Sequence, residues 1–397
     1  MKTTKNLGIS VYPDLRKQEE IKEYMELASK YGCKRVFSSM FNVEGDNDEV
    51  LNCFKQLIDN AHDFGLQVSL DVNPECFRRF GAGPEDLSVF DDLGVDILRL
   101  DVDNGVEDDI KLINNPYGIA IEFNGSALPV STIIELISRG VDPKQILVCH
   151  NFYPQRYTGM KWKTFVEINA QLKELGVRVG AFVSSNAKNS HGVWGAIHGL
   201  PTVEQHRGKP IDLQLREIFL NGAVDTIFIG NAYATEEEFR KIAEVMQNIK
   251  PDEEKHPIIK IKRSYGNVAD DQFYPQHKIK INTIGELTDV EREILFNYFP
   301  HSDVGDGSEW IWRSRMPRFL YSKIGVEVRQ HREKQFEPGT VVVVNNNYRH
   351  YAGEVQVVLR PIENDGTRNI VGYLDNDEFS FFKKIPDREV VVFLVGR

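Results

Sequence analysis

Short apolar runs alternate with amphipathic segments along roughly the first 250 residues of the chain, the rhythm of parallel α/β folds. The intervening segments, such as 17–32, 48–65, 130–140 and 163–176, place apolar residues at helical spacing and often end near a glycine. Eight apolar runs predict β-strands, at 7–12, 35–40, 67–73, 97–103, 119–124, 146–152, 178–184 and 226–232. Eight strand–helix units in this length predict a closed (β/α)8 barrel, a TIM barrel.

The pattern changes after a polar, proline-bounded segment at 251–257, which suits a linker. The chain beyond it consists of short β-rich runs between Gly, Asn, Pro and Asp turns. We expect strands at 258–264, 277–282, 325–330, 340–346, 353–360 and 389–396. The sequence therefore predicts a barrel domain at 1–252 and a smaller, mainly antiparallel β domain at 256–397.

Polar residues alternate with apolar ones in three consecutive predicted barrel strands, "VSLDVN", "LRLDVD" and "IAIEFN". If the apolar residues pack against the helices, the polar ones project into the barrel. Burying that many ionisable groups costs several kcal/mol each unless they are paired, hydrated or catalytic. Catalysis is the usual reason at the carboxyl ends of barrel strands. The side chains expected inside the barrel are Asp71, Arg99, Asp101, Glu122, Asn124 and His150.

Two interpretations remain open for part of this set. Arg99 lies early in its strand, so it could form a structural ion pair with one carboxylate in the barrel floor, or it could belong to the site. Asp103, Asp108 and Asp109 suit a solvated loop and a helix start, where the helix dipole favours acids.

Two connections extend the predicted site. The segment 150–162 follows strand six, and 184–210 follows strand seven and is long for a barrel loop. Barrel enzymes often bind phosphate after strands seven and eight. Donors for such an anion are Ser185, Lys188, His206 and Arg207, each of which could equally be an ordinary surface side chain.

The amino-acid composition limits the classes of molecule that the protein is expected to bind. The chain has 59 acidic and 48 basic residues, and its formal charge of −11 disfavours nucleic acid and anionic membranes as partners. Four cysteines are scattered without metal-binding spacing, which is typical of a reducing compartment. The first residues lack the apolar core of a signal peptide, and no run approaches the roughly 20 apolar residues of a membrane span. We therefore expect a soluble cytoplasmic protein.

The barrel segments "GISVYP", "DVNPE", "LRLD", "HNFYPQRYTGM" and "GLPTVEQHR", with "VVVNNNYRHYAGEVQVVL" and "RNIVGYL" in the second domain, resemble the MupG-type 6-phospho-N-acetylmuramidases. The resemblance covers nearly the whole chain. It implies a TIM barrel followed by a cyclophilin-like β domain. It also implies a cytoplasmic glycosidase that cleaves the β-1,4 bond between N-acetylmuramic acid 6-phosphate and N-acetylglucosamine during cell-wall sugar recycling.

Glycoside hydrolysis generally needs two carboxyl groups, one that donates a proton and one that acts as nucleophile or base. We expect Asp101 and Glu122 in these roles, with Asp71 as the next candidate. Strand seven ends "FVSSN" without an acid, although many barrel glycosidases have a carboxyl there. This departure favours an unusual placement or participation by the substrate acetamido group, and leaves retention or inversion open.

The resemblance also suggests substrate ligands. Arg156, Tyr157 and Thr158 could bind the lactyl carboxylate or the 6-phosphate, with Lys188, His206 and Arg207 on the other anion. Asn124, His150 and Asn151 lie beside the expected carboxyls. In the second domain, Asn345 and Tyr348 belong to a donor-rich motif that could close over the barrel or be a simple hairpin.

Two other functions remain open. Asp71, Asp101, Glu122 and His150 could instead bind a divalent cation in a sugar-phosphate epimerase or aldolase. A non-catalytic sugar-phosphate binding protein is the other alternative. The glycosidase interpretation needs no metal or cofactor, and the oligomeric state, including a homo-oligomer, stays open.

Overall fold

The computed structural model describes residues 5–13, 17–41, 43–102, 104–193, 196, 198–249, 276–303, 308–386 and 389–396. The chain forms two compact units, Met1–Met246 and Gln247–Arg397. The predicted linker 251–257, the predicted strand 258–264 and Asp103 lie outside the described residues.

The first unit is a closed barrel of eight parallel strands in sequence order, which confirms the predicted TIM barrel. The strands are β1 (Asn6–Ser10), β2 (Arg35–Ser39), β3 (Gln67–Val72), β4 (Ile97–Leu100), β5 (Ala120–Asn124), β6 (Ile146–Cys149), β7 (Arg178–Val183) and β8 (Thr226–Ile229). Seven of the strands fall within the predicted runs, and β1 begins one residue before its predicted run 7–12.

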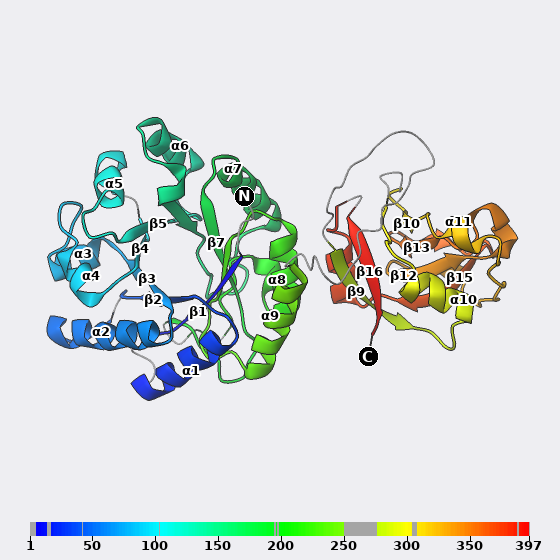
Figure 1. Cartoon of the computed structure of the whole chain (residues 1–397), viewed down its shortest axis with the longest axis horizontal. Helices are drawn as coiled ribbons and strands as arrows, with labels where there is room; N and C mark the ends of the chain where they lie inside the picture. The colour runs from blue at the N-terminus through cyan, green and yellow to red at the C-terminus, as the bar shows by residue number, and fades with distance from the viewer. Residues whose placement is uncertain are drawn as a thin grey trace. The chain divides into compact units, whose positions relative to one another are not determined.

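Helices surround these strands (Figure 1). In α2 (Asn47–Asp63), the Asp46 side chain accepts a hydrogen bond from the Glu49 amide and caps the first turn, while residues at helical spacing, from Val50 to Ala61, are buried. The others are α1 (Gln18–Lys30), α3 (Pro74–Phe80), α4 (Ser88–Leu93), α5 (Val106–Ile113), α6 (Val130–Ser138), α7 (Trp162–Glu174), α8 (Ile211–Leu220) and α9 (Glu236–Ile249), with short 3₁₀ turns η1 (Pro143–Gln145) and η3 (Glu204–His206).

Aromatic side chains fill one side of the barrel interior. Phe182 lies 5.1 Å from Phe37 and 5.3 Å from Phe228, measured between ring centroids, and Phe152 packs against this group. Gly8 makes room for it, because a Cβ at this position would lie 2.4 Å from the Phe228 ring. The dense aromatic packing therefore depends on a glycine in β1.

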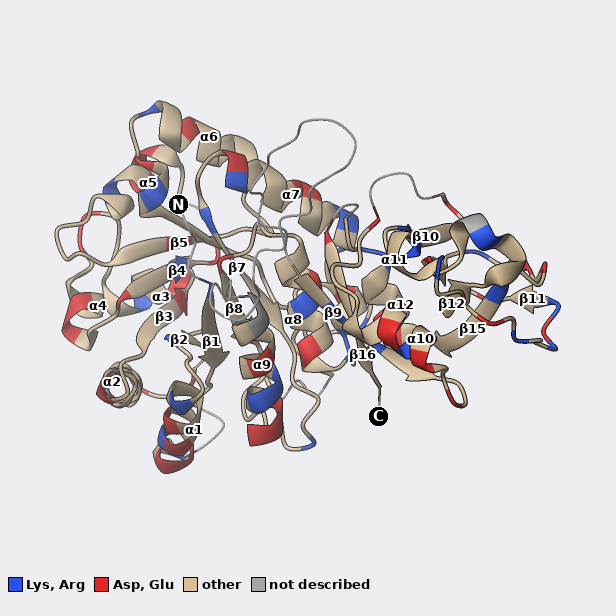
Figure 2. Cartoon of the chain, turned by 45° about the vertical axis from the view of Figure 1, so that its right-hand side comes forward, with Lys and Arg blue, Asp and Glu red and all other residues tan. Residues whose placement is uncertain are grey.

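The other side of the interior is charged. Strand register places Asp71 of β3 beside Arg99 of β4, and Arg99 beside Glu122 of β5. Charged residues otherwise lie mostly on the surrounding helices, as Figure 2 shows. The barrel thus has polar residues inside β3, β4 and β5, as their alternating sequences predicted.

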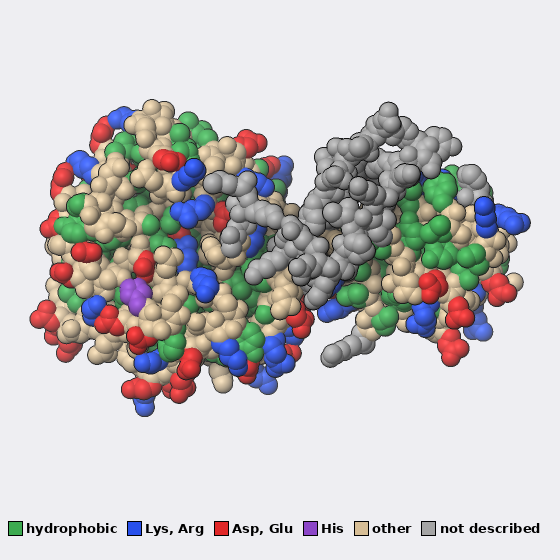
Figure 3. Space-filling model, in the orientation of Figure 1, with side chains coloured by type: hydrophobic (Ala, Val, Ile, Leu, Met, Phe, Trp, Pro, Cys, Tyr) green, Lys and Arg blue, Asp and Glu red, His purple; other side chains and the backbone are tan. Residues whose placement is uncertain are grey.

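The second unit contains a six-stranded sheet of order β10-β13-β12-β15-β9-β16, antiparallel except for the pair β9 and β16. Hydrophobic side chains gather on part of its visible face in Figure 3. The strands of the second unit are β9 (Gln276–Thr283), β10 (Ile311–Ser314), β11 (Gln335–Phe336), β12 (Thr340–Val344), β13 (Val355–Val358), β14 (Ile362–Glu363), β15 (Arg368–Tyr373) and β16 (Val390–Val395). The six-stranded sheet contains all of them except β11 and β14. The helices of this unit are α10 (Asp289–Arg292), the π-helix η4 (Glu293–Asn297), α11 (Arg318–Tyr321), the 3₁₀ segment η5 (Asn346–Tyr351) and α12 (Asn376–Phe382).

One predicted strand of this unit, 325–330, is wrong. The segment is irregular because side-chain amides take the place of a neighbouring strand. The Val326 amide donates to the Asn346 side chain at 2.9 Å, and the Arg329 amide donates to the Asn369 side chain at 3.0 Å.

In the part of the chain that the structure describes, no helix is both long enough and apolar enough to cross a membrane.

Replacing Gly8 tests the packing of the aromatic half. We expect Gly8→Ala to lower the free energy of unfolding by about 1–3 kcal/mol, because the added methyl group overpacks the Phe228 ring. Denaturant unfolding followed by circular dichroism measures this change. Gly83→Ala is the matched control, since a Cβ there has no heavy atom of the described structure within 4 Å. Equal stability of the two variants would contradict the packing argument.

Candidate functional site

Arg99 lies at the centre of the polar cluster. Its side chain is 2% exposed, and Nη1 donates to Asp71 Oδ1 at 2.5 Å. Nη2 donates to Asn151 Oδ1, at the carboxyl end of β6. One guanidinium group therefore joins residues of β3, β4 and the loop after β6.

Asp101 follows β4 and completes the cluster on its more exposed side. Its Oδ1 lies 3.5 Å from Arg99 Nη1, and its side chain is 32% exposed. Asn124 Nδ2 donates to both the backbone oxygen and Oδ1 of Asp101, each at 3.1 Å. Two of the predicted carboxyls, Asp71 and Asp101, thus meet with the predicted ligands Asn124 and Asn151 around Arg99.

The two carboxyls differ in environment. Burial raises the pKa of Asp71 to about 6, although the charge and hydrogen bond of Arg99 act in the opposite direction. Asp71 Oδ1 and Asp101 Oδ1 contact the same Arg99 nitrogen, so their separation cannot exceed the sum of those two contacts. For this pair of oxygens, the limit is compatible with the ~5 Å separation typical of retaining glycosidases.

Glu122, predicted to form the catalytic pair with Asp101, is bound to an arginine of β2. Its side chain is 1% exposed, and Oε2 accepts a hydrogen bond from Arg35 Nη2 at 2.9 Å. Arg35 also donates to Ser69, and its guanidinium carbon lies 4.9 Å from the Phe228 ring centroid. Glu122 therefore belongs to a buried ion pair that links the charged and aromatic sides of the interior.

His150 is a further correction, because it does not project into the barrel. Its Nε2 lies 2.7 Å from Asn169 Oδ1 of α7, and its ring packs against Phe165 of the same helix. Since side chains alternate along a strand, the inward neighbour is Cys149. Burial lowers the pKa of His150 to about 4.

Arg207 was expected to bind an anion of the substrate, but its donors bind the protein. It forms an ion pair with Glu204 at 2.7 Å and donates to backbone oxygens of both loops that carry predicted ligands. Those oxygens belong to Tyr153, Gln155, His198 and Gly199. Arg207 is thus the clamp that joins the loop after β6 to the loop after β7.

Glu204 holds the other side of this clamp. Its carboxylate accepts hydrogen bonds from the backbone amides of Tyr157 at 2.7 Å and Gly159 at 2.8 Å. Tyr157 has φ of 70°, a left-handed conformation that is unfavourable for a side chain of this size, so these bonds offset local strain. The hydrogen bond from Arg207 lowers the pKa of Glu204 to about 2, and Glu204 therefore stays ionised at neutral pH.

Two further predicted anion ligands are also internal. His206 is fully buried, and its Nε2 lies 3.0 Å from Glu217 of α8. Ser185 is 3% exposed and donates to Glu238 of α9 at 2.8 Å. Both side chains fasten the loop after β7 to the helices, which is a correction to the role expected for them.

Four predicted ligands lie on the surface of the same loops. Arg156, Tyr157, Thr158 and Lys188 are exposed. Thr158 donates to the Gln155 backbone oxygen at 2.7 Å. Neither Arg156 nor Lys188 has an ion pair with another described residue, so their charges are available to an anion.

The two residues of the second domain that were predicted to bind substrate differ in exposure. Asn345 is fully buried, and its side chain bonds Gly366, Asn347 and Asn369, so it stabilises the fold rather than facing a ligand. Tyr348 is 53% exposed.

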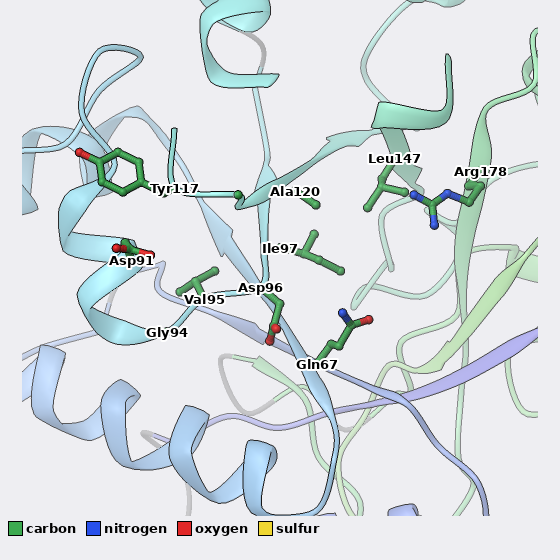
Figure 4. Close-up of a pocket in the computed structure, with 11 residues that line it drawn as sticks. Gln67, Asp91, Gly94, Val95, Asp96, Ile97, Tyr117, Ala120, Leu147 and Arg178 are labelled. Atoms are coloured by element: carbon green, nitrogen blue, oxygen red, sulfur yellow. The ribbon is translucent and has the colours of Figure 1, made fainter. Parts of the chain in front are cut away.

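A cavity of about 430 Å³ opens at the other end of the barrel (Figure 4). It is lined by the first residues of β3, β4, β5 and β7, namely Gln67, Ile97, Ala120 and Arg178. Because barrel enzymes carry their chemistry at the carboxyl ends of the strands, this cavity is separate from the candidate site.

The four predicted ligands of a divalent cation do not assemble. His150 faces α7, while Asp71 and Glu122 bind guanidinium groups. Among the residues that the structure describes, no three His, Cys, Asp or Glu side chains gather in a way that could hold a metal ion.

Sequence reasoning missed Arg35 and Glu204. Arg35 is the one charged residue of the strand "RVFSS" and stands at an inward position, and this charge was the available signal. Glu204 stands three residues before Arg207, a spacing at which side chains can pair, but the backbone amides it binds were not visible in the sequence.

Both units match known families. Residues 7–244 match the family model described as 6-phospho-N-acetylmuramidase, N-terminal, and residues 277–393 match the model described as 6-phospho-N-acetylmuramidase, C-terminal. No curated protein matches the chain.

Two solved structures are similar along nearly the full chain. The structure of an uncharacterized B. cereus protein is 30% identical, has a TM-score of 0.79, and the match covers 98% of this chain and 99% of that one. A conserved protein of unknown function from a locus in Enterococcus faecalis is 20% identical with a TM-score of 0.66, covering 98% and 96%. At that identity the second likeness shows the fold alone.

Replacing Arg207 distinguishes a clamp from a substrate ligand. We expect Arg207→Lys to lower the free energy of unfolding by about 1–3 kcal/mol, because one ammonium group cannot bind Glu204 and four backbone oxygens together. Limited proteolysis should then cut within 153–159 or 198–204 faster than in the parent protein. Arg156→Lys is the control, since Arg156 is exposed in the same loop. Unchanged stability with a raised KM would favour the substrate role that the sequence suggested.

Proposed function

Because this chain belongs to the 6-phospho-N-acetylmuramidase family and is a glycosidase acting on phosphorylated muramic acid sugars, we propose that it cleaves the β-1,4 bond between N-acetylmuramic acid 6-phosphate and N-acetylglucosamine. The products are the two monosaccharides. The proposed setting is cytoplasmic recycling of cell-wall sugars, in which a phosphorylated disaccharide is hydrolysed after uptake.

The observation that carries this proposal is the arrangement of Asp71 and Asp101 on one guanidinium nitrogen of Arg99, at the carboxyl ends of β3 and β4. A buried carboxyl and a partly exposed carboxylate a few ångströms apart provide the two groups that glycoside hydrolysis needs. Elsewhere in the barrel interior, aromatic side chains and the Arg35–Glu122 pair are bound to one another rather than to this site.

We assign the proton donor role to Asp71. Its raised pKa of about 6 keeps a substantial fraction protonated near neutral pH, which suits a general acid. The role of the second carboxyl falls to Asp101, because its side chain is the more exposed and is oriented by Asn124. It acts either as nucleophile or as the group that orients the substrate acetamido oxygen, and both routes retain the anomeric configuration.

Glu122 is proposed to support this pair rather than to react. Its charge lies against Arg35, and strand register places it beside Arg99. An anion at this position adds to the electrostatic cost of ionising Asp71 and so contributes to its raised pKa.

Arg156 and Lys188 are proposed to bind the two anionic groups of the substrate, the 6-phosphate and the lactyl carboxylate. They are the predicted cations of the two loops that no described acidic side chain neutralises, whereas Arg207 is bound to Glu204. An anionic substrate needs such local charges because the chain as a whole carries −11.

Substitution of the two aspartates tests the proposed chemistry. Asp71→Asn and Asp101→Asn should each lower kcat by about 10²–10⁴-fold with retained folding, because a proton transfer or a stabilising charge is lost. In the parent protein, kcat/KM should fall as the pH rises through about 6, since Asp71 then loses the proton it donates. The assay is release of N-acetylglucosamine from the phosphorylated disaccharide.

Asp91→Asn is the matched control, because Asp91 lines the cavity at the opposite end of the barrel. Near-parental turnover by Asp101→Asn would remove it from the pair. A kcat/KM that stays level between pH 5 and 8 would remove Asp71 as the acid.

Substitution of the exposed cations tests substrate selection. Arg156→Gln and Lys188→Gln should each raise KM for the phosphorylated disaccharide about tenfold, the loss expected for one charge-assisted hydrogen bond. Turnover of the unphosphorylated disaccharide should be poor in the parent protein. It should change little in the variant that has lost the phosphate ligand and fall further in the variant that has lost the carboxylate ligand. Lys163→Gln on α7 serves as the control. Comparable parental rates on both disaccharides would rule out a phosphate-selective site.

A further inference from the structure

A layered stack of charged and aromatic groups underlies η5 of the second domain. Glu354 is fully buried and binds both Arg313 and Arg318, each at 2.8 Å. The two guanidinium groups lie 5.4 and 5.1 Å from the centre of the Tyr351 ring. Tyr348 stacks on Tyr351 with ring centroids 5.0 Å apart and an interplanar angle of 24°.

This stack holds an aromatic ring rigidly at the surface. Tyr348 is 53% exposed, although its ring has a partner on one face. A tyrosine that is ordered before it meets a ligand loses little conformational entropy on binding. Such a ring suits the apolar face of a sugar.

A cavity of about 210 Å³ lies beside η5. Its lining is Ser322, Lys323, Ile324 and Gly325, which follow α11, with Asn346 and Arg349 of η5. The Asn346 side-chain oxygen accepts the Val326 amide at 2.9 Å, which ties the two walls together. Gly325 has φ of 89°, and a Cβ there would lie 3.0 Å from the Asn346 amide nitrogen, so glycine permits this close approach.

The lining carries two positive charges without an ion-pair partner. Lys323 and Arg349 are exposed, and neither side chain makes an ion pair or hydrogen bond with another described residue. The adjacent cations Arg313 and Arg318, in contrast, both form ion pairs with Glu354. In a chain with a formal charge of −11, two unneutralised cations on one small cavity favour a local anion.

We propose that this cavity of the second domain binds the phosphate group of a small sugar phosphate, with the sugar ring against Tyr348. A phosphate monoester carries a charge of about −1.5 to −2 at pH 7 and matches two cations better than a single carboxylate does. Tyr348 lies between the lining residues Asn346 and Arg349 in η5, so it belongs to the same segment as one of the two cations. The lining consists of residues of the second unit, so the proposal does not rest on the catalytic roles proposed above.

Hydrogen–deuterium exchange of the full chain, read by mass spectrometry, tests the site in place. The probes are N-acetylglucosamine 6-phosphate, inorganic phosphate and N-acetylglucosamine, none of which has a glycosidic bond to cleave. We expect the sugar phosphate to slow exchange in 322–326 and 346–351. Inorganic phosphate should do so only at higher concentration, and the neutral sugar should not.

The variant pair Lys323→Gln/Arg349→Gln should weaken this protection at least about tenfold in ligand concentration. Arg332→Gln/Lys334→Gln makes the same charge change at exposed positions outside the cavity lining and should retain it. Tyr348→Ala should weaken binding of the sugar phosphate and spare that of inorganic phosphate.

Three results would overturn the proposal: protection confined to barrel peptides, equal protection by the neutral sugar, or full protection in the Lys323→Gln/Arg349→Gln variant. Equal losses for both phosphates in Tyr348→Ala would overturn the part assigned to the ring.

Discussion

The candidate site depends on the need to neutralise one buried guanidinium group. Arg99 is almost completely removed from water, and an isolated charge there would be severely destabilising. Asp71 and Asp101 contact its Nη1, and Asn151 accepts a hydrogen bond from its Nη2. The same contacts fix both carboxyls within a few ångströms of each other, so the interaction that makes Arg99 tolerable also sets the geometry of the proposed chemistry.

The barrel interior is divided into a charged half, which contains this cluster, and an aromatic half. Phe37, Phe182 and Phe228 fill one half as a dry aromatic core, which Gly8 makes possible. Arg35 lies at the boundary, with Glu122 on one side and the Phe228 ring on the other. A low-dielectric neighbourhood on one side strengthens the electrostatic interactions on the other.

Both units use ion pairs between a carboxylate and arginine to organise a surface. In the barrel, Glu204 and Arg207 bind backbone groups of two loops and leave Arg156 and Lys188 exposed. In the second domain, Glu354 binds two arginines that support a tyrosine pair. In each case the paired charges bind other groups of the protein. The exposed cations that have no ion pair with a described residue are the ones available to a ligand.

The sequence by itself determined the barrel, its eight strands and the polar alternation in β3, β4 and β5, because strand periodicity is a local property of the chain. It also indicated the family and drew attention to Asp71, Asp101, Asn124 and Asn151. It could not separate ligands from structural groups of the same chemical type. His206, Arg207, Ser185 and Asn345 have suitable donors, yet each donor binds a group that is distant along the chain or supplied by the backbone.

Only the tertiary structure decided which of these groups meet. His150 faces α7 and not the barrel, because the strand's alternation places its neighbour Cys149 inward. Asp109, expected in solvent, is buried and accepts the Asn104 amide at 3.1 Å. Glu122 binds Arg35, from a strand three positions away in the barrel, so its partner could not be read from adjacent residues. Such pairings depend on barrel closure and side-chain reach, which are properties of the folded chain and not of any short segment.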